Sequence, residues 1–365
     1  MKKIEIFLKN ILLNFLLYFS RSKRNQDAKS PEEFSRIMFI RLNRIGDALV
    51  TTPLLHLIKQ KTNARLYVLC GKKNKDAYQN NKDIDEIIIF DKGINGIFRV
   101  LRFIKENQID CLVDLHDDVS TTVSFILALA KTKYKFALEK ENKKIYTGTI
   151  PKLNPAKSHI VERLLEIAKL FGIKDIDYSN VRINYKPKES SLDEAKSFVK
   201  NNFEKHNFLI GVNISAGSDA RFWGIERFKK LLDFLSKFDI NILILSAPKD
   251  LEEANAISNS FEVNGLQKSK VFCNNEFDLF ASIISQIDLL FTPDTMAVHL
   301  ASAFNKPVFG VYVKYKTNDM IWSPYNTKFD YVVTEEPTLD NVSYEQVIAK
   351  FKPFLEKSLA EYSGK

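Results

Sequence analysis

Short apolar runs alternate along the chain with segments whose apolar positions recur at helical spacing. In the first half the runs are RIMFIRL, ARLYVLC, EIIIF and CLVDL, at 36–42, 64–70, 86–90 and 111–115. Helical patterns lie at 46–62, 95–107 and 119–131. Continuous apolar strands separated by helices are typical of a parallel sheet covered on both faces.

The alternation lapses between about 175 and 205 and then restarts. In this segment the chain is polar and contains Pro187, which is typical of a linker that leads into a solvated helix. In the second half we predict strands at 208–215, 241–247, 270–273, 288–294 and 307–313, with helices at 225–238, 250–259, 276–287 and 295–304. The sequence therefore predicts an α/β chain with two Rossmann-like, doubly wound parallel-sheet domains. We expect them to face each other across a cleft lined by the carboxyl ends of their strands.

The domain boundaries follow from this pattern, since 365 residues exceed the usual size of one hydrophobic core. The predicted segments are an N-terminal amphipathic helix at 1–35, a first domain at 36–180, a linker at 181–205, a second domain at 206–340, and a C-terminal helix at 341–365 that returns to the first domain.

Residues 1–24 combine apolar positions at helical spacing with lysine and arginine at both flanks. The apolar stretch is shorter than the roughly 20 residues that a spanning helix needs. No small-residue cleavage site of a signal peptide follows it. The pattern favours a helix lying on the anionic inner face of the cytoplasmic membrane. The alternative is a helix that packs on protein.

The net charge of +9 favours anionic partners such as a nucleotide or a membrane surface. Three scattered cysteines are too few for a disulfide framework and indicate a reduced, cytoplasmic protein. Basic and aromatic residues do not interleave as they do in single-strand nucleic-acid platforms, so we expect no nucleic-acid partner. Binding of nucleic acid through charge alone is the weaker alternative.

The stretch FIRLNRIGDALVTTPLL, 39–55, changes from a strand to a helix through Arg44, Ile45, Gly46 and Asp47. Asp47 can be the N-cap of that helix, or its carboxylate can face a substrate. We interpret it as both, with the cap holding a catalytic base in place.

Two further motifs follow strands in the second half. In GVNISAGSDARFW, 211–223, small residues precede a helix, so backbone N–H groups and the helix N-terminus can hold a phosphate, with Arg221 as the balancing cation. A structural turn is the alternative. In FTPDTMAVHLASAFNKPVFG, 291–310, Asp294 and Thr295 can cap a helix, and His299 lies one turn after Thr295. Alone these are a cap and a core histidine, but beside a small-residue loop they indicate a nucleotide diphosphate site.

His116, Asp117 and Asp118 follow the strand CLVDL and resemble metal ligands only superficially. Neighbouring residues in a loop seldom converge on one metal, and no second cluster with ligand spacing is present in the sequence. We therefore expect no metal site.

The motifs RIGDALVTTPLL, VDLHDD, HIVERLLEIAKLFG, SAGSDARFW and PDTMAVHLASAFNKPV occur in this order. Over residues 36–345 they resemble glycosyltransferase family 9, the lipopolysaccharide heptosyltransferases with the two-domain GT-B fold. The resemblance implies an inverting, metal-independent glycosyltransferase without a cofactor. Its substrates would be a nucleotide-diphospho-sugar, most often ADP-heptose, and a lipid-linked or oligosaccharide acceptor of the lipopolysaccharide type or another cell-surface glycan.

Family roles can be placed on matching positions of this sequence. The resemblance makes Asp47 the general base. The nucleotide-sugar site implied by the family motifs comprises Ala216, Gly217, Ser218, Arg221, Asp294, Thr295, Met296 and His299. We assign to the acceptor side Arg44, Gly46, Thr51, His116 and Asp117.

Departures from the family pattern leave the donor sugar and the acceptor open. Met296 stands where glycine is usual, and His116-Asp117 where Gln-Gly is usual. Two other classes stay open as well: another sugar-nucleotide enzyme on the same fold, such as an epimerase, and a non-catalytic binding member.

Overall fold

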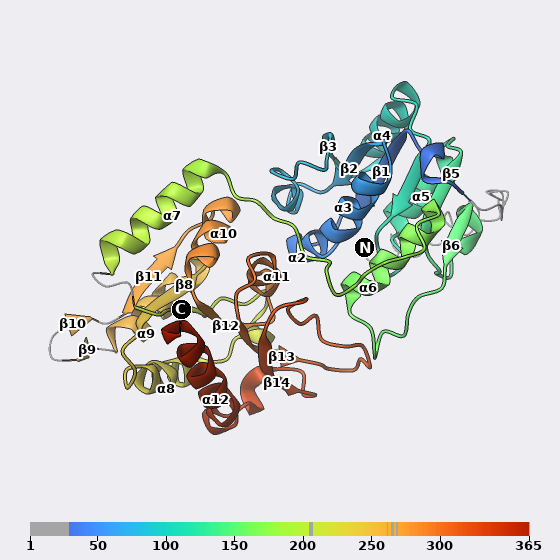
Figure 1. Ribbon diagram of the computed structural model, residues 1–365. Coiled ribbons are helices and arrows are strands. Elements are labelled where there is room, and N and C mark those ends of the chain that lie inside the picture. Colours follow the sequence, from blue (N-terminus) through green and yellow to red (C-terminus); the bar gives the residue numbers. More distant parts are fainter. Residues whose placement is uncertain (1–28, 204–206, 261, 264–265, 268, 365) are drawn as a thin grey trace. The chain divides into compact units, whose positions relative to one another are not determined.

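Two six-stranded parallel sheets form the framework of the chain, each within its own unit (Figure 1). The computed structural model describes residues 29–203, 207–260, 262–263, 266–267 and 269–364. The boundary between the units falls between Asn184 and Tyr185. The predicted α/β class with two Rossmann-like domains is confirmed.

The first sheet has the strand order β3-β2-β1-β4-β5-β6, and every neighbouring pair is parallel. Its strands are β1 (Arg36–Arg41), β2 (Arg65–Cys70), β3 (Glu86–Ile89), β4 (Cys111–Asp114), β5 (Tyr134–Leu138) and β6 (Gly148–Ile150). The helices of this unit are α2 (Ile45–Leu49), α3 (Thr52–Lys61), α4 (Ile94–Glu106), α5 (Thr121–Leu129) and α6 (Ile160–Leu165), with 3-10 turns η1 (Pro31–Glu33), η2 (Lys75–Ala77), η3 (Lys143–Ile145) and η4 (Glu166–Phe171).

The second sheet repeats this arrangement, with the order β11-β8-β7-β12-β13-β14 and parallel pairs throughout. Its strands are β7 (Leu209–Asn213), β8 (Asn241–Ser246), β11 (Ser269–Cys273), β12 (Leu289–Pro293), β13 (Val308–Val313) and β14 (Phe329–Thr334). The helices are α7 (Glu189–Asn202), α8 (Ile225–Leu235), α9 (Leu251–Asn259), α10 (Phe277–Gln286), α11 (Met296–Ala303) and α12 (Tyr344–Ser363), with 3-10 turns η5 (Asp219–Arg221), η6 (Pro248–Asp250) and η7 (Leu339–Asn341). The short strands β9 (Glu262–Val263) and β10 (Leu266–Gln267) pair separately.

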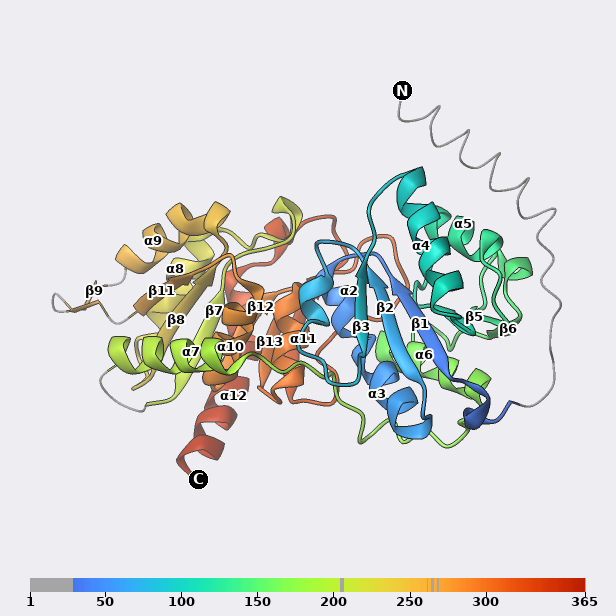
Figure 2. The same cartoon turned by 90° about the horizontal axis from the view of Figure 1, so that it is seen from above.

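Helices cover both faces of each sheet. In the first unit, α4 and α5 pack on one face of the sheet, and α3 and α6 lie on the other (Figure 2). In the second unit, α8, α9 and α12 share one core, whereas α7, α10 and α11 pack together on the opposite face. This double coverage is why the strands have nearly continuous apolar sequences.

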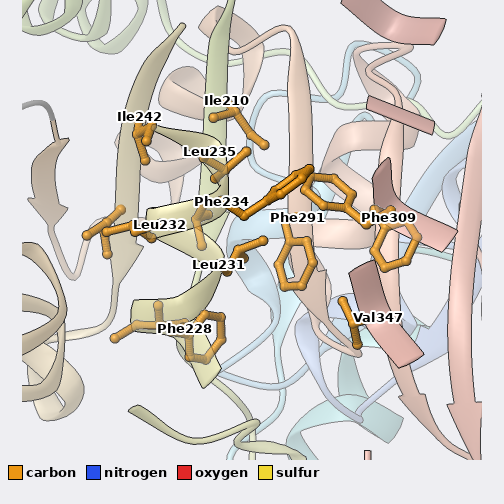
Figure 3. Close-up of a cluster of buried hydrophobic side chains, with 14 of the residues drawn as sticks. Ile210, Phe228, Leu231, Leu232, Phe234, Leu235, Ile242, Phe291, Phe309 and Val347 are labelled. Carbon is orange, nitrogen blue, oxygen red and sulfur yellow. The ribbon is translucent and has the colours of Figure 1, made fainter. Parts of the chain in front are cut away.

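Phe291 of β12 occupies the centre of the second unit's core (Figure 3). Its ring stacks on Phe309 of β13, with centroids 5.6 Å apart, and meets Phe351 of α12 edge-on at 5.2 Å. Trp223 and Phe228 complete the aromatic group around it. The buried ring of Phe291 in β12 therefore contacts side chains of β13, α8 and α12.

The single helix predicted at 46–62 is interrupted. It consists of α2 and α3, and Thr51 is the residue before α3 begins. Pro53 lies in the first turn of α3, where its missing N–H is tolerated. In a continuous helix its ring would clash with the carbonyl of Leu49, so the break follows from the proline.

The predicted linker at 181–205 contains the helix that the polar segment was expected to lead into, α7. This helix packs against α10 and places Phe198 edge-on to Phe272. One other prediction is wrong. The C-terminal helix does not return to the first domain. It packs on α8, β13 and β14 of the second unit, since Val347, Phe351 and Leu355 complete that unit's core.

Three strands of the two six-stranded sheets were not predicted. Lys135 interrupts the apolar run of β5, β6 has three residues, and β14 begins with exposed Phe329 followed by Asp330. The amphipathic helix predicted at the N-terminus lies outside the described residues. Among the helices that are described, none has the length and hydrophobicity that a membrane span requires.

Replacing the central ring should destabilise the second unit selectively. Phe291→Ala leaves a cavity among four aromatic rings, and we expect it to lower the free energy of unfolding by about 3–5 kcal/mol. Both tryptophans, Trp223 and Trp322, lie in this unit, so denaturant unfolding followed by their fluorescence measures the effect. Phe329→Ala, at a ring that is 39% exposed, is the matched control. Equal losses in the two variants would contradict the central role of Phe291.

Candidate active site

The predicted site residues gather at one place in each sheet. In the first sheet β1 and β4 are neighbours, and in the second sheet β7 and β12 are neighbours in the equivalent position. At these points the strand order reverses, and ligands of open α/β sheets bind at the carboxyl ends of such strands. Asp47 and His116 follow β1 and β4, whereas Ser215 and Asp294 follow β7 and β12.

Asp47 lies in the first turn of α2 and is nearly buried. Its Oδ2 accepts a hydrogen bond from the backbone N–H of Arg44 at 3.1 Å. Its Oδ1 lies 3.4 Å from a terminal nitrogen of Arg41, and the Arg44 guanidinium, which is largely exposed, is 3.9 Å from Oδ2. The expectation that Asp47 is the N-cap is corrected: Arg44 is the N-cap, and Asp47 at the third helical position bonds back to it.

Arg41 fixes this carboxylate to the sheet. It is the last residue of β1, is 2% exposed, and donates a hydrogen bond to the carbonyl of Leu115 beyond β4. Asn74 in turn donates to the Arg41 carbonyl at 2.9 Å. The loop after β1 is thereby tied to the ends of its neighbours.

A buried ionic network lies beneath the loop after β4. Asp114 accepts hydrogen bonds from Lys140 Nζ and from Tyr146 Oη, both at 2.7 Å. Burial opposes ionisation of Asp114, but the charge of Lys140 and the hydrogen bond from His116 outweigh it and hold the pKa well below its usual value. Burial and the neighbouring Asp114 raise the pKa of Tyr146.

His116 connects this network to the loop that carries Asp47. Its Nδ1 lies 2.7 Å from Asp114 Oδ1, and its Nε2 accepts the backbone N–H of Leu42 at 3.2 Å. Because Nε2 accepts, the ring proton is on Nδ1 and is donated to Asp114. His116 is 2% exposed and both nitrogens have internal partners, so its side chain holds the end of β1 and does not face solvent.

Of the other residues assigned to the acceptor side, some have internal partners and others are exposed. Thr51 is fully buried, donating to the Ala48 carbonyl and pairing with the Tyr78 hydroxyl at 2.9 Å. Asp117 binds Arg163 of α6 at 2.8 Å and Lys152 at 3.4 Å. Arg44 is largely exposed, and Gly46 and Asp117 are partly exposed.

In the second unit the small-residue turn is open to solvent. Ala216 is buried, whereas Gly217 and Ser218 are exposed, and a Cβ built on Gly217 would meet no atom within 4 Å. Buried Asn213, the last residue of β7, donates to the Ser215 carbonyl at 3.2 Å and to Thr292 Oγ1 at 2.9 Å. The turn is thereby fixed to the end of β12.

Arg221 and Asp294 form an ion pair above this turn. Arg221 ends η5, and its guanidinium lies 3.2 Å from Asp294 Oδ2. The two side chains are 31% and 23% exposed, so the pair is partly open to ligands. The Asp294 N–H donates to the Val311 carbonyl, which fixes the backbone beside the buried Tyr312.

Thr295 is the N-cap of α11. Its hydroxyl oxygen accepts from the Ala297 N–H at 3.2 Å and from Asn213 Nδ2 at 3.3 Å. Met296 begins the helix and is half-buried. His299 is 4% exposed, with its ring centroid 6.3 Å from that of Trp322, so its side chain is buried beside that ring.

Three positioning residues were not predicted from the sequence. Asn213, Lys140 and Arg163 contact the site residues Thr295, His116 and Asp117, each from a distant part of the sequence. Lys140 lies in the loop after β5 and Arg163 lies in α6, where nothing local distinguishes their side chains from solvent-exposed ones. The only available signal was at Asn213, the terminal polar residue of an otherwise apolar strand.

Comparison with known proteins gives a consistent set of similarities. The model of glycosyltransferase family 9 (heptosyltransferase) matches residues 97–352. The Escherichia coli (strain K12) protein provisionally named lipopolysaccharide heptosyltransferase 4 is 22% identical over 96% of both chains. A family 9 glycosyl transferase structure from Veillonella parvula superposes with a TM-score of 0.76 at 20% identity, covering 90% of this chain and 99% of that one. ADP-heptose lipopolysaccharide heptosyltransferase II from E. coli gives a TM-score of 0.69 at 16% identity, over 88% and 99% of the two chains.

The Asp114 network makes the first unit sensitive to acid. Because the folded-state pKa of Asp114 is depressed, its contribution to stability is present above the unfolded value of about 3.9 and is lost as pH falls below it. Asp114→Asn leaves Lys140 without its carboxylate. We expect this variant to be about 3–5 kcal/mol less stable at pH 7, with the difference from the wild type narrowing in acid.

Thermal unfolding between pH 7 and 3 measures this effect. Asp76→Asn, at a partly exposed carboxylate of the same unit, should leave both the midpoint at pH 7 and the acid profile nearly unchanged. A constant difference between Asp114→Asn and the wild type at every pH would contradict the assigned ionisation.

Proposed function

The chain belongs to glycosyltransferase family 9, and we propose that it transfers heptose from ADP-heptose to a lipopolysaccharide-type or other cell-surface glycan acceptor with inversion at the anomeric carbon. The main support for the proposal is that each sheet has a different polar group at the point where its strand order reverses. One contains the Asp47 carboxylate, and the other contains the Arg221–Asp294 pair beside an open small-residue turn.

The second unit is assigned to the donor. A diphosphate can replace Asp294 as the partner of the Arg221 guanidinium, and exposed N–H groups of the turn at 216–218 can approach its oxygens. The N-terminus of α11 adds the positive end of the helix dipole. The Thr295 hydroxyl also keeps one proton that it can donate. The relative with ADP-heptose in its name supports an ADP-linked donor.

The first unit is assigned to the acceptor, with Asp47 as the general base. Asp47 takes the proton of the acceptor hydroxyl while that oxygen forms a bond to the anomeric carbon. The bond from this carbon to the β-phosphate oxygen breaks, and ADP leaves with the electron pair. Arg221 and the turn N–H groups stabilise the charge that develops on the leaving phosphate. Exposed Arg44 beside Asp47 can bind an anionic acceptor.

We further propose that the enzyme is cytoplasmic and works at the inner face of the cytoplasmic membrane. The apolar and basic spacing of residues 1–24 supports a peripheral contact with anionic lipid. A lipid-linked acceptor would be presented at the same surface.

Asp47→Asn should separate catalysis from donor binding. The amide preserves the size of the side chain and cannot take a proton, so we expect transfer from ADP-heptose to a heptose-free acceptor to fall by about 10²–10⁴-fold. ADP affinity, measured by calorimetry, should change less than about twofold, because the donor site lies in the other unit. Asp193→Asn, on the exposed side of α7, is the matched control. Near-normal transfer by Asp47→Asn would refute the base assignment.

Charge reversal at Arg221 tests the donor site. Arg221→Glu loses a charge-assisted contact to the diphosphate and adds repulsion, so ADP affinity should fall by about 10- to 100-fold. Arg221→Lys should retain most of the affinity, since an ammonium can still meet a phosphate. Lys237→Glu makes the same charge change at an exposed position after α8 and should have little effect. An unchanged ADP affinity in Arg221→Glu would move the phosphate site elsewhere.

A further inference from the structure

The outward face of α4 carries two large apolar side chains that have no place in the core. Ile94 is 71% exposed and Phe98 is 63% exposed. The other exposed large apolar side chains in the described part of the chain are only 37–44% exposed. Residues four apart on a helix share a face, so Ile94 and Phe98 form one apolar patch.

The packing of α4 on its sheet does not require this patch. Val100 and Ile104 are buried in the core of the first unit, with Ile97, Leu101 and Phe103 packed around them, and Gly96 lies against the Asp91 carbonyl. Helix α4 covers the same sheet face as α5 (Figure 2). The helix therefore has an apolar inner face and a second apolar group directed away from the sheet.

Basic side chains surround the patch. The segment 91–106 contains the cations Lys92, Arg99, Arg102 and Lys105 and the anions Asp91 and Glu106. Arg99 pairs with Asp91, and Arg102 lies 3.5 Å from Glu106. Lys105 and Arg102 lie on the same side of the helix as Phe98, at offsets of seven and four residues. The face thus combines exposed apolar groups with a cationic surplus.

We propose that the outward face of α4 docks on an anionic lipid bilayer. Ile94 and Phe98 enter the boundary between headgroups and acyl chains, and Arg102 and Lys105 meet lipid phosphates. Charge complementarity favours an anionic bilayer over a purely apolar protein surface, because the latter offers no anionic groups to the cations of α4. The surface goes beyond the proposed function: it is distinct from residues 1–24 and takes no part in donor binding or proton transfer.

Co-sedimentation of the full chain with vesicles tests the proposal. The vesicles contain phosphatidylglycerol and phosphatidylethanolamine, or phosphatidylcholine alone as the neutral comparison. The double variant Ile94→Gln/Phe98→Gln should lose about tenfold in affinity for the anionic vesicles, since two buried apolar side chains are removed. Arg102→Gln/Lys105→Gln should lose several-fold and show a weaker dependence on salt.

Leu129→Gln is the matched control. Leu129 is a 44% exposed apolar residue at the end of α5 in the same unit, and its replacement should leave vesicle affinity within about twofold of the wild type. If Ile94→Gln/Phe98→Gln binds anionic vesicles as tightly as the wild type, the proposal is wrong.

A local probe reports on α4 independently of any other membrane contact. In a Cys273→Ser background, which leaves only the buried Cys70 and Cys111, Phe98→Cys is labelled with an environment-sensitive fluorophore. Anionic vesicles should shift its emission to the blue, whereas a label at Leu129→Cys should not respond. A label at Phe98→Cys that is unaffected by vesicles, or that shifts without lipid as protein concentration rises, would overturn the proposal and indicate a protein partner or a second copy.

These measurements contain neither donor nor acceptor, so they do not depend on sugar transfer. Asp47→Asn should bind vesicles like the wild type even though it is inactive. A failure of the assigned reaction would leave the vesicle result unchanged, and a failure of vesicle binding would leave ADP binding by the second unit unchanged.

Discussion

Coverage of each parallel sheet on both faces is the constraint on which the rest of this structure depends. Side chains that point from either face are buried under helices, so polar groups can meet a ligand only at the strand ends. The shared strand order also sends the chain to opposite faces after β1 and β4, and again after β7 and β12. The loops at these points diverge, which leaves the polar residues between them accessible.

The two equivalent positions are organised by different physical means. In the first unit, charged groups are buried and must be paired, so Asp114, Lys140 and His116 form a network with defined geometry. That network holds the end of β1 and, through it, the short helix that carries Asp47. In the second unit, the neutral amide of Asn213 joins the turn to α11, and the charged pair Arg221–Asp294 stays partly exposed. A rigid carboxylate suits proton transfer, whereas an exposed ion pair can exchange a carboxylate for a phosphate.

Helix α4 shows how one element can serve both the fold and a surface. Its buried side chains, Val100 and Ile104, satisfy the sheet, and the opposite side is therefore free to carry residues that the fold does not require. A cationic, partly apolar face on the unit assigned to the acceptor is consistent with an acceptor that resides in a membrane. Donor binding needs no such surface, because a nucleotide-sugar is dissolved in water.

The sequence by itself determined the fold class, most of the strands and the loops that carry the site, because apolar runs and the residues after them are local signals. It also placed Asp47, Arg221 and Asp294 at strand ends. It did not reveal that Thr51 and His116 point inward, that α12 completes the second unit, or that β5, β6 and β14 extend the sheets. Those features depend on contacts between distant residues, such as Arg41 with the Leu115 carbonyl and Asn213 with Thr292. Whether a polar side chain meets a ligand or a buried partner is decided by which strands become neighbours, and only the tertiary structure specifies that.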